Sequence, residues 1–129
     1  MANGGIPMSK RPTEVLRDCL TAFAAHDREA MEALVADDYT FTSPMDNALS
    51  RESYFKICWP ESKQFEAFEI VHEADIGDTA FTTYEARMVN GHRFRNTELN
   101  TVRNGKLVAT EVYFGWDLPH KVKPGEHKG

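Results

Sequence analysis

The sequence has few cysteines, no long apolar run and no excess of basic residues, and each absence narrows the classes of protein it can belong to. Its two cysteines, Cys19 and Cys58, form neither a disulfide framework nor a CxxC metal-binding motif. The five histidines include no pair spaced to share a metal ion, so we expect no metal site. No apolar stretch approaches a bilayer span and the N-terminus has no signal pattern, which predicts a cytoplasmic protein with no membrane partner.

Motifs for nucleotide binding and covalent catalysis are also missing. There is no glycine-rich phosphate loop, no G-x-S-x-G motif and no cysteine in a nucleophile signature. The formal net charge is -5 and the basic residues are scattered, which argues against nucleic acid binding. We therefore expect no cofactor and no nucleic acid partner, and a small apolar or amphipathic molecule as the ligand.

The overall composition is typical of a soluble globular protein. The chain has 129 residues, of which 41% are hydrophobic and 27% charged, enough to bury one core. Residues 1–12 are polar and contain two glycines and two prolines, which predicts a loose N-terminal arm. We expect one domain over residues 13–118, followed by a tail over residues 119–129.

Hydrophobic spacing predicts three helices in the first half of the chain, each preceded by a capping residue. Thr13, Asp27 and Ser50 stand at the expected N-cap positions, and Pro60 should end the third helix because it lacks a backbone donor. The predicted helices cover residues 13–23, 27–36 and 50–59.

Alternation of apolar and polar residues predicts five strands, which form most of the second half. Asn90-Gly91 is typical of a two-residue hairpin turn, because both residues accept positive φ. Asn104-Gly105 predicts a second turn. The predicted strands cover residues 39–43, 68–76, 79–89, 92–102 and 106–116.

A two-residue turn at Asn90-Gly91 would fix which side chains share a sheet face. It would pair Arg87 with Phe94, Glu85 with Asn96 and Thr83 with Glu98. The two-residue alternation of side chains along the next strand places Phe114 and Trp116 on the same face. We expect this aromatic-rich face to be concave. Glu85, Arg87 and Glu98 then form either a structural ion pair or part of a ligand site. We accordingly name Glu85, Arg87, Asn96, Phe114 and Trp116 as candidate ligand-binding residues.

The opposite face would carry Tyr84, Met88, Leu99 and Tyr113, which favours a homodimer formed through it. On its own strand, His72 falls among apolar residues. It is interpreted either as a core histidine with a polar partner or as a proton-transfer group.

Three short segments carry a resemblance to a known superfamily. They are His26-Asp27 between the first two helices, the run from Ala36 to Pro44, and the closing turn Asn104-Gly105 with the later Tyr113-Phe114. In this order of elements, residues 13–118 resemble the SnoaL-like branch of the nuclear transport factor 2-like superfamily, which includes polyketide cyclase and ketosteroid isomerase relatives. The resemblance implies an α+β, cone-shaped, barrel-like fold with about three N-terminal helices on a curved, mostly antiparallel sheet around one small ligand.

The catalytic residues of those relatives are only partly present. Where the ketosteroid isomerase resemblance implies a base Asp and an oxyanion-hole Tyr, this chain has Ser43 and Cys19, whereas Glu98 stands where it implies an oxyanion-hole Asp. In the similar limonene-epoxide hydrolases, the corresponding residues fall at Val112, Thr40 and Thr42, which also differ.

Two functions therefore remain open. One is a cofactor-independent isomerase, cyclase or hydratase/dehydratase acting on a small apolar carbonyl compound, with Glu98 and His72 as proton-transfer groups. The other is a non-catalytic ligand-binding or protein-interaction module of the same fold. The candidate ligand-binding set also includes Ser43, Tyr54 and Trp59.

Overall fold

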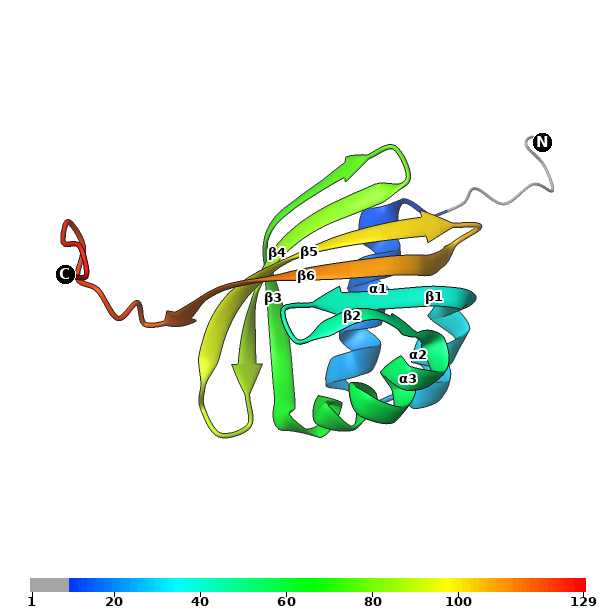
Figure 1. The fold of residues 1–129 in the computed structure, drawn as a ribbon, viewed down its shortest axis with the longest axis horizontal. Helices are drawn as coiled ribbons and strands as arrows, with labels where there is room; N and C mark the ends of the chain where they lie inside the picture. Colours follow the sequence, from blue (N-terminus) through cyan, green and yellow to red (C-terminus); the bar gives the residue numbers. More distant parts are fainter. Residues whose placement is uncertain (1–9) are drawn as a thin grey trace.

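The computed structural model describes residues 10–129, and Figure 1 shows their path. Of the arm predicted over residues 1–12, residues 1–9 lie outside the described residues, and Pro12 is the first residue of α1. Among residues 10–129, no helix is long and apolar enough to cross a membrane. The helices are α1 (Pro12–Ala24), α2 (Arg28–Leu34), α3 (Arg51–Ile57) and a 3₁₀ helix (Trp59–Gln64), and the strands are β1 (Val35–Ser43), β2 (Asp46–Ser50), β3 (Phe65–Ile76), β4 (Thr79–Met88), β5 (Arg93–Arg103) and β6 (Lys106–Leu118).

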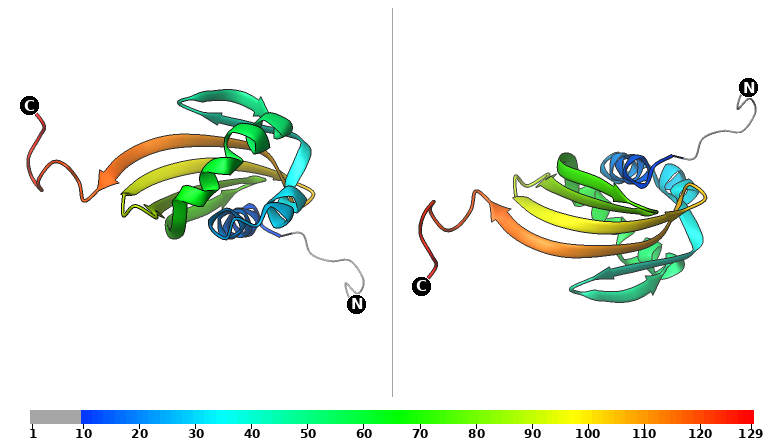
Figure 2. Two further views of the ribbon diagram at one scale, coloured as in Figure 1. Left: turned by 90° about the horizontal axis from the view of Figure 1, so that it is seen from below. Right: turned by 90° about the horizontal axis from the view of Figure 1, so that it is seen from above.

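One curved sheet carries the helices on its concave side, as the two views in Figure 2 show. The strand order is β2-β1-β6-β5-β4-β3, and every neighbouring pair is antiparallel except β1 with β6. The expected α+β fold, with three helices on a curved and mostly antiparallel sheet, is confirmed. The sheet stays open between its edge strands β2 and β3, so it does not close into a barrel.

Capping groups start the helices, as predicted for two of the three. The Asp27 side chain accepts the Ala30 N–H at α2, and the Ser50 side chain accepts the Ser53 N–H at α3. At α1 the prediction is wrong, because the helix begins at Pro12 and Thr13 lies inside it. The carboxylate of Asp75, on β3, instead accepts the Thr13 N–H at 2.9 Å and the Thr13 hydroxyl at 3.1 Å. A distant strand therefore supplies the cap.

Two short elements lie where no element was predicted. Strand β2 pairs with β1 and forms an edge of the sheet. Pro60 does not end helical structure, because the 3₁₀ helix that follows α3 has the proline in its first turn. A first-turn N–H has no partner within a helix, so its absence costs little there.

The turn between β4 and β5 differs from the prediction by one residue, and the two-residue turn is wrong. Val89 joins Asn90 and Gly91 in a three-residue turn, closed by bonds from Gly91 N to the Met88 carbonyl oxygen and from Met88 N to that of His92. Gly91 has a φ of 92°, the left-handed conformation that the bulged end of such a turn requires.

This shift moves every β4 side chain to the opposite face of the sheet. Ala86, not Arg87, pairs with Phe94, and Tyr84, not Glu85, pairs with Asn96. The β4 residues expected on the concave face therefore lie on the convex face.

A β-bulge in β3 has a similar effect on His72. The register shifts between Ile70 and His72, so His72 pairs with Thr83 and is exposed on the convex face. Its expected placement among the apolar residues of β3 is wrong. Beyond the bulge, Glu73 faces α1 and accepts hydrogen bonds from the Arg17 guanidinium.

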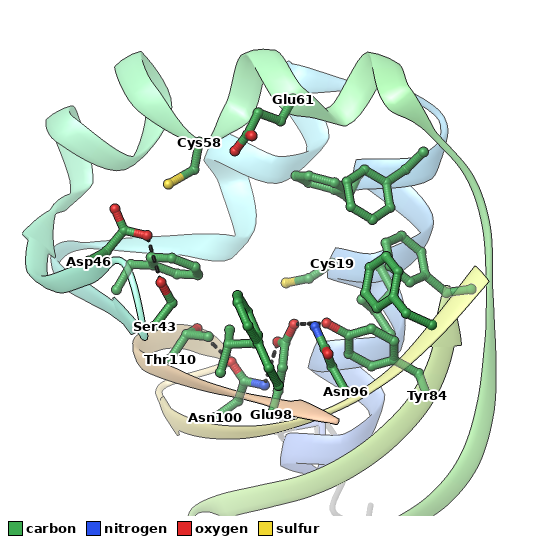
Figure 3. A pocket seen from close by; sticks show the side chains of 18 of the residues that line it. Cys19, Ser43, Asp46, Cys58, Glu61, Tyr84, Asn96, Glu98, Asn100 and Thr110 are labelled. Atoms are coloured by element: carbon green, nitrogen blue, oxygen red, sulfur yellow. Dashed lines mark hydrogen bonds between the residues drawn. The ribbon is translucent and has the colours of Figure 1, made fainter. Parts of the chain in front are cut away.

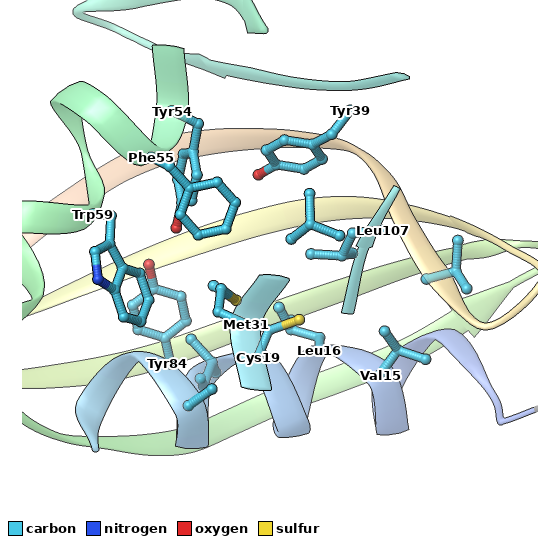
Figure 4. Packing of buried hydrophobic residues seen from close by; sticks show 14 of the residues in the cluster. Val15, Leu16, Cys19, Met31, Tyr39, Tyr54, Phe55, Trp59, Tyr84 and Leu107 are labelled. Carbon is cyan, nitrogen blue, oxygen red and sulfur yellow. The ribbon is translucent and has the colours of Figure 1, made fainter. Parts of the chain in front are cut away.

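The core lies between the helices and the concave face (Figure 4). Val15, Leu16 and Cys19 of α1 are buried there together with Tyr39 of β1. Trp59 belongs to the same core, where its ring packs edge-on against Phe23 with centroids 5.5 Å apart.

Candidate functional site

A cavity of about 440 Å³ lies between the concave face and the helices (Figure 3), within the usual size range for small-molecule sites. Its walls are mainly apolar, with aliphatic and sulfur-containing side chains from α1, α2 and the sheet. The aromatic lining residues are Phe23, Tyr39, Phe41, Tyr54, Phe65, Phe68, Tyr84, Phe94, Phe114 and Trp116.

One carboxylate, that of Glu98 on β5, lies among these apolar walls. Its Oε2 accepts a hydrogen bond of 2.6 Å from the Tyr84 hydroxyl, and its Oε1 accepts one of 3.2 Å from the Asn100 amide. Each carboxylate oxygen has a further lone pair. Glu98 is thus fixed by two donors and keeps acceptor capacity for a ligand.

A chain of hydrogen bonds extends from Glu98 to the far wall of the cavity. The side-chain amide oxygen of Asn100 accepts a hydrogen bond of 2.6 Å from the Thr110 hydroxyl. The Thr110 hydroxyl oxygen in turn accepts one of 2.8 Å from the Tyr39 hydroxyl. Asn100 and Thr110 are buried, so these bonds satisfy groups that water cannot reach. The network fixes the orientation of Asn100 and, through it, that of Glu98.

Burial controls the ionisation of this cluster. It raises the pKa of Glu98 above its ordinary value, although the hydrogen bonds from Tyr84 and Asn100 act in the opposite direction. Burial, followed by the negative charge of Glu98, raises the pKa of both Tyr54 and Tyr84 well above their ordinary value. Glu98 therefore exchanges protons closer to neutrality than an exposed glutamate does.

Asn96 belongs to the same wall but has a mainly structural contact. Its side-chain oxygen accepts the Gly115 N–H at 3.3 Å, beside the bulge that shifts the β5–β6 register between Phe94 and Asn96. A Cβ at Gly115 would lie 2.2 Å from the Arg95 carbonyl oxygen, so only glycine fits at this point of close approach between β5 and β6.

Two further carboxylates, Asp46 of β2 and Glu61 of the 3₁₀ helix, stand on either side of Cys58 at the cavity (Figure 3). The Ser43 hydroxyl donates to Asp46 at 2.7 Å. Burial, assisted by the charges of Asp46 and Glu61, raises the pKa of the Cys58 thiol to about 12. Cys58 is therefore a thiol at neutral pH and a poor nucleophile.

At the other side of the cavity, Asp117 is paired with basic groups. Its carboxylate contacts His92 Nε2 at 3.0 Å and Lys121 Nζ at 3.4 Å. Hydrogen bonds from these two groups lower the pKa of Asp117 below its ordinary value. Trp116, which precedes Asp117 on β6 and is half exposed, completes this part of the lining.

The structure brings six of the ten sequence-predicted site residues to the cavity. They are Ser43, Tyr54, Asn96, Glu98, Phe114 and Trp116.

The other four lie elsewhere. Glu85 and Arg87 are on the convex face because of the one-residue turn difference, and each forms an ion pair there, Glu85 with Arg95 at 2.7 Å and Arg87 with Glu66 at 3.0 Å. His72 is exposed on the same face and Trp59 is in the core. Glu98 therefore takes no part in the ion pair considered for Glu85, Arg87 and Glu98, and instead accepts a hydrogen bond from Tyr84.

Three important lining residues were not named as candidates from the sequence. Asn100 follows Glu98 by two positions, so strand alternation alone would place it on the same face. Tyr84 needed the correct turn length. Tyr39 reaches Thr110 through the parallel pairing of β1 with β6, which joins distant parts of the chain and has no local signal.

Among residues 10–129, no group of three or more histidine, cysteine, aspartate or glutamate side chains could hold a metal ion.

The family match agrees with this geometry. The SnoaL-like domain family matches residues 16–110, which run from within α1 to the first part of β6. The chain belongs to the SnoaL-like domain family. This family is part of the nuclear transport factor 2-like superfamily, so the recognition made from the three short segments is confirmed. None of the curated proteins compared with the sequence matches it.

Solved structures of SnoaL-like and related proteins show the same fold at low sequence identity. A nuclear transport factor 2-like protein of unknown function from Burkholderia xenovorans is 24% identical with a TM-score of 0.69, covering 91% of this chain and 87% of that one. IdmH from Streptomyces antibioticus, provisionally assigned as a polyketide cyclase, is 21% identical with a TM-score of 0.66, covering 80% and 91%.

A de novo designed protein with a curved β-sheet also matches, with 16% identity, a TM-score of 0.72 and coverage of 84% and 88%. This fold can thus be designed from first principles. Because one fold can support many functions, the activity of this SnoaL-like chain depends on the side chains that line its cavity.

Proposed function

We propose that the cavity binds a small, mostly apolar carbonyl compound and that Glu98 transfers protons on it without a cofactor. The observation that supports this most is the position of the Glu98 carboxylate, fixed by Tyr84 and Asn100 among apolar walls. A carboxylate in such surroundings has a pKa closer to the working pH, which makes it an efficient general base and acid.

The proposed chemistry begins with removal of a proton from the carbon next to the ligand carbonyl. The carboxylate of Glu98 takes this proton, the C–H electron pair forms a carbon–carbon double bond, and the carbonyl pair moves to oxygen to give an enolate. In a β,γ-unsaturated carbonyl compound this enolate is a dienolate, and return of the proton to its γ-carbon re-forms the carbonyl and completes an isomerisation. If the enolate carbon instead attacks a second carbonyl, the proton passes to the new alkoxide and completes a cyclisation.

These steps move protons and rearrange carbon bonds, and no electrons are gained or lost overall. They require only one group that accepts and returns a proton. His72 lies outside the cavity and has no part in this proposal.

Proton exchange on a simple ketone tests the proposal without knowledge of the natural substrate. Acetonaphthone, an aromatic methyl ketone, is incubated with the protein in D₂O and loss of its methyl proton signal is followed by NMR. We expect the protein to accelerate exchange and Glu98→Gln to abolish the acceleration. The control is Glu69→Gln, the same substitution on the exposed convex face, which should leave the rate unchanged.

A second candidate function is binding without chemistry. It is favoured by Ser43 and Cys19, which line the cavity where the resemblance implies a catalytic Asp and Tyr. In that case acetonaphthone should bind, seen as broadening of its NMR signals, while wild type and Glu98→Gln should give the same exchange rate. That result would refute the catalytic proposal and leave a carrier or an interaction module.

The homodimer and the cytoplasmic location stay predictions. The expected dimer surface changes, because Tyr84 and Met88 line the cavity and only Leu99 and Tyr113 of the predicted set lie on the convex face. Light scattering at micromolar concentration would give a doubled mass if the dimer forms.

A further inference from the structure

The charged groups on the cavity lining are almost all of one sign. The chain has 15 lysine and arginine residues, all within the described residues, and none of them lines the cavity. Four carboxylates do line it: Asp46, Glu61, Glu98 and Asp117. Of these, within residues 10–129, only Asp117 has a cationic partner. An anionic ligand would therefore find negative charge and no lysine or arginine to neutralise it.

Asp46 and Glu61 are the accessible pair among these carboxylates. Glu98 already accepts two hydrogen bonds deep in the cavity, whereas Asp46 accepts one, from Ser43, and Glu61 has none among the described residues. The negative charges of Asp46 and Glu61 both raise the pKa of the Cys58 thiol, which lies between them (Figure 3). The two carboxylates thus face the same region of the cavity from two different elements.

Aromatic rings from β1 and α3 line the same cavity as this pair. Phe41 and Tyr39 of β1 pack against Tyr54 of α3, with ring centroids 5.2 Å and 5.4 Å from it. The faces of aromatic rings attract cations, and ammonium groups bound by proteins commonly combine such rings with a carboxylate. The same rings provide an apolar surface for the rest of a ligand.

We propose that the cavity selects a ligand with a positively charged nitrogen on an apolar body. The ammonium group lies at Asp46 and Glu61, and the body lies between the aromatic walls and reaches toward Glu98. This inference rests on the proposed function in that both place one ligand in this cavity, and it adds the chemical class of that ligand. A neutral ligand would fit the walls and leave the two carboxylates to water.

Three probes of similar shape and different charge test the inference: naphthylethylammonium, naphthylethanol and naphthylacetate. Their dissociation constants are measured by naphthyl fluorescence at low and high salt. We expect the ammonium to bind about tenfold more tightly than the alcohol, from two partly exposed ion pairs, and the carboxylate to bind least. The advantage of the ammonium should shrink at high salt, while the affinity of the alcohol stays constant.

The double variant Asp46→Asn, Glu61→Gln assigns the selectivity to these side chains. It should bring the affinity for the ammonium down to that for the alcohol. The matched control Asp37→Asn, Glu69→Gln makes the same change in net charge at two exposed sites outside the cavity and should keep the advantage. Circular dichroism confirms that both variants are folded.

Three results would overturn the inference, and the first two leave the proposed binding cavity intact. Equal binding of the ammonium and the alcohol by wild type, or an advantage that survives in the Asp46→Asn, Glu61→Gln variant, refutes the charge selectivity while the cavity still binds ligand. Failure of all three probes to bind at millimolar concentration refutes the binding cavity and this inference together. Unchanged acetonaphthone exchange in Glu98→Gln refutes only the catalytic role.

Discussion

Replacing Tyr84 by Phe removes one hydroxyl from the cavity and tests the arrangement around Glu98. Tyr84 is 4% exposed, and its hydroxyl donates to Glu98 at 2.6 Å. A hydrogen bond to a charged group contributes about 1.5–3 kcal/mol, compared with about 0.5–1.5 kcal/mol for a neutral one. The cost of Tyr84→Phe should therefore be about 1 kcal/mol larger when Glu98 is ionised, which corresponds to a further rise in the Glu98 pKa of about one unit.

The sign of the pH dependence follows from linkage. Because the folded-state pKa of Glu98 is raised, its contribution to stability is complete below the unfolded pKa and is lost as pH rises through the folded pKa. Loss of the Tyr84 hydroxyl raises that folded pKa further. The stability of Tyr84→Phe should consequently fall more steeply with rising pH than that of wild type.

Urea unfolding at about pH 5 and about pH 8 measures this difference. Tyr113→Phe is the matched control, because the Tyr113 hydroxyl also donates to a glutamate, Glu111, at 3.1 Å, but the residue is 57% exposed. It should show no measurable change at either pH. If the two tyrosine variants behave alike, or if the cost of Tyr84→Phe is the same at both pH values, the assigned link between Tyr84 and Glu98 is wrong.

Two further predictions concern the framework that holds the site. Gly115→Ala should destabilise the protein by about 1–3 kcal/mol in urea unfolding, because its Cβ would overlap the Arg95 carbonyl oxygen. Gly129→Ala, with nothing within 4 Å, should have no effect, and equal stabilities would contradict the close approach of β5 and β6. Asp75→Ala should cost about 1 kcal/mol through loss of the cap on Thr13, and slow amide exchange retained at Thr13 would argue against that cap.

Local signals in the sequence predicted much of the fold. Asp27 and Ser50 cap helices as expected because a cap depends on side chains a few residues apart. At α1 the same rule chose Thr13, but the partner of that residue is Asp75, 62 positions along the chain. No local rule could identify that partner, because the contact exists only after β3 has packed on α1.

In the candidate site, too, only some of the residues were placed correctly from local signals in the sequence. Asn96 and Glu98 were correctly placed on the concave face, and Phe114 faces the same cavity from β6. On β4 one extra turn residue, Val89, exchanged the two faces, and on β3 a bulge turned His72 outward. Asn-Gly favours both two-residue and three-residue turns, so the sequence left the length undecided.

That single residue changes the chemistry expected of Glu98. With the predicted register, Arg87 would be its partner, and an adjacent guanidinium would hold the carboxylate ionised as a structural ion pair. With the observed register, Arg87 faces solvent and pairs with Glu66, while Glu98 meets the neutral hydroxyl of Tyr84 inside the cavity. Burial is then opposed only by neutral donors, so the pKa of Glu98 rises. The case for proton transfer at Glu98 therefore depends on the length of the turn between β4 and β5.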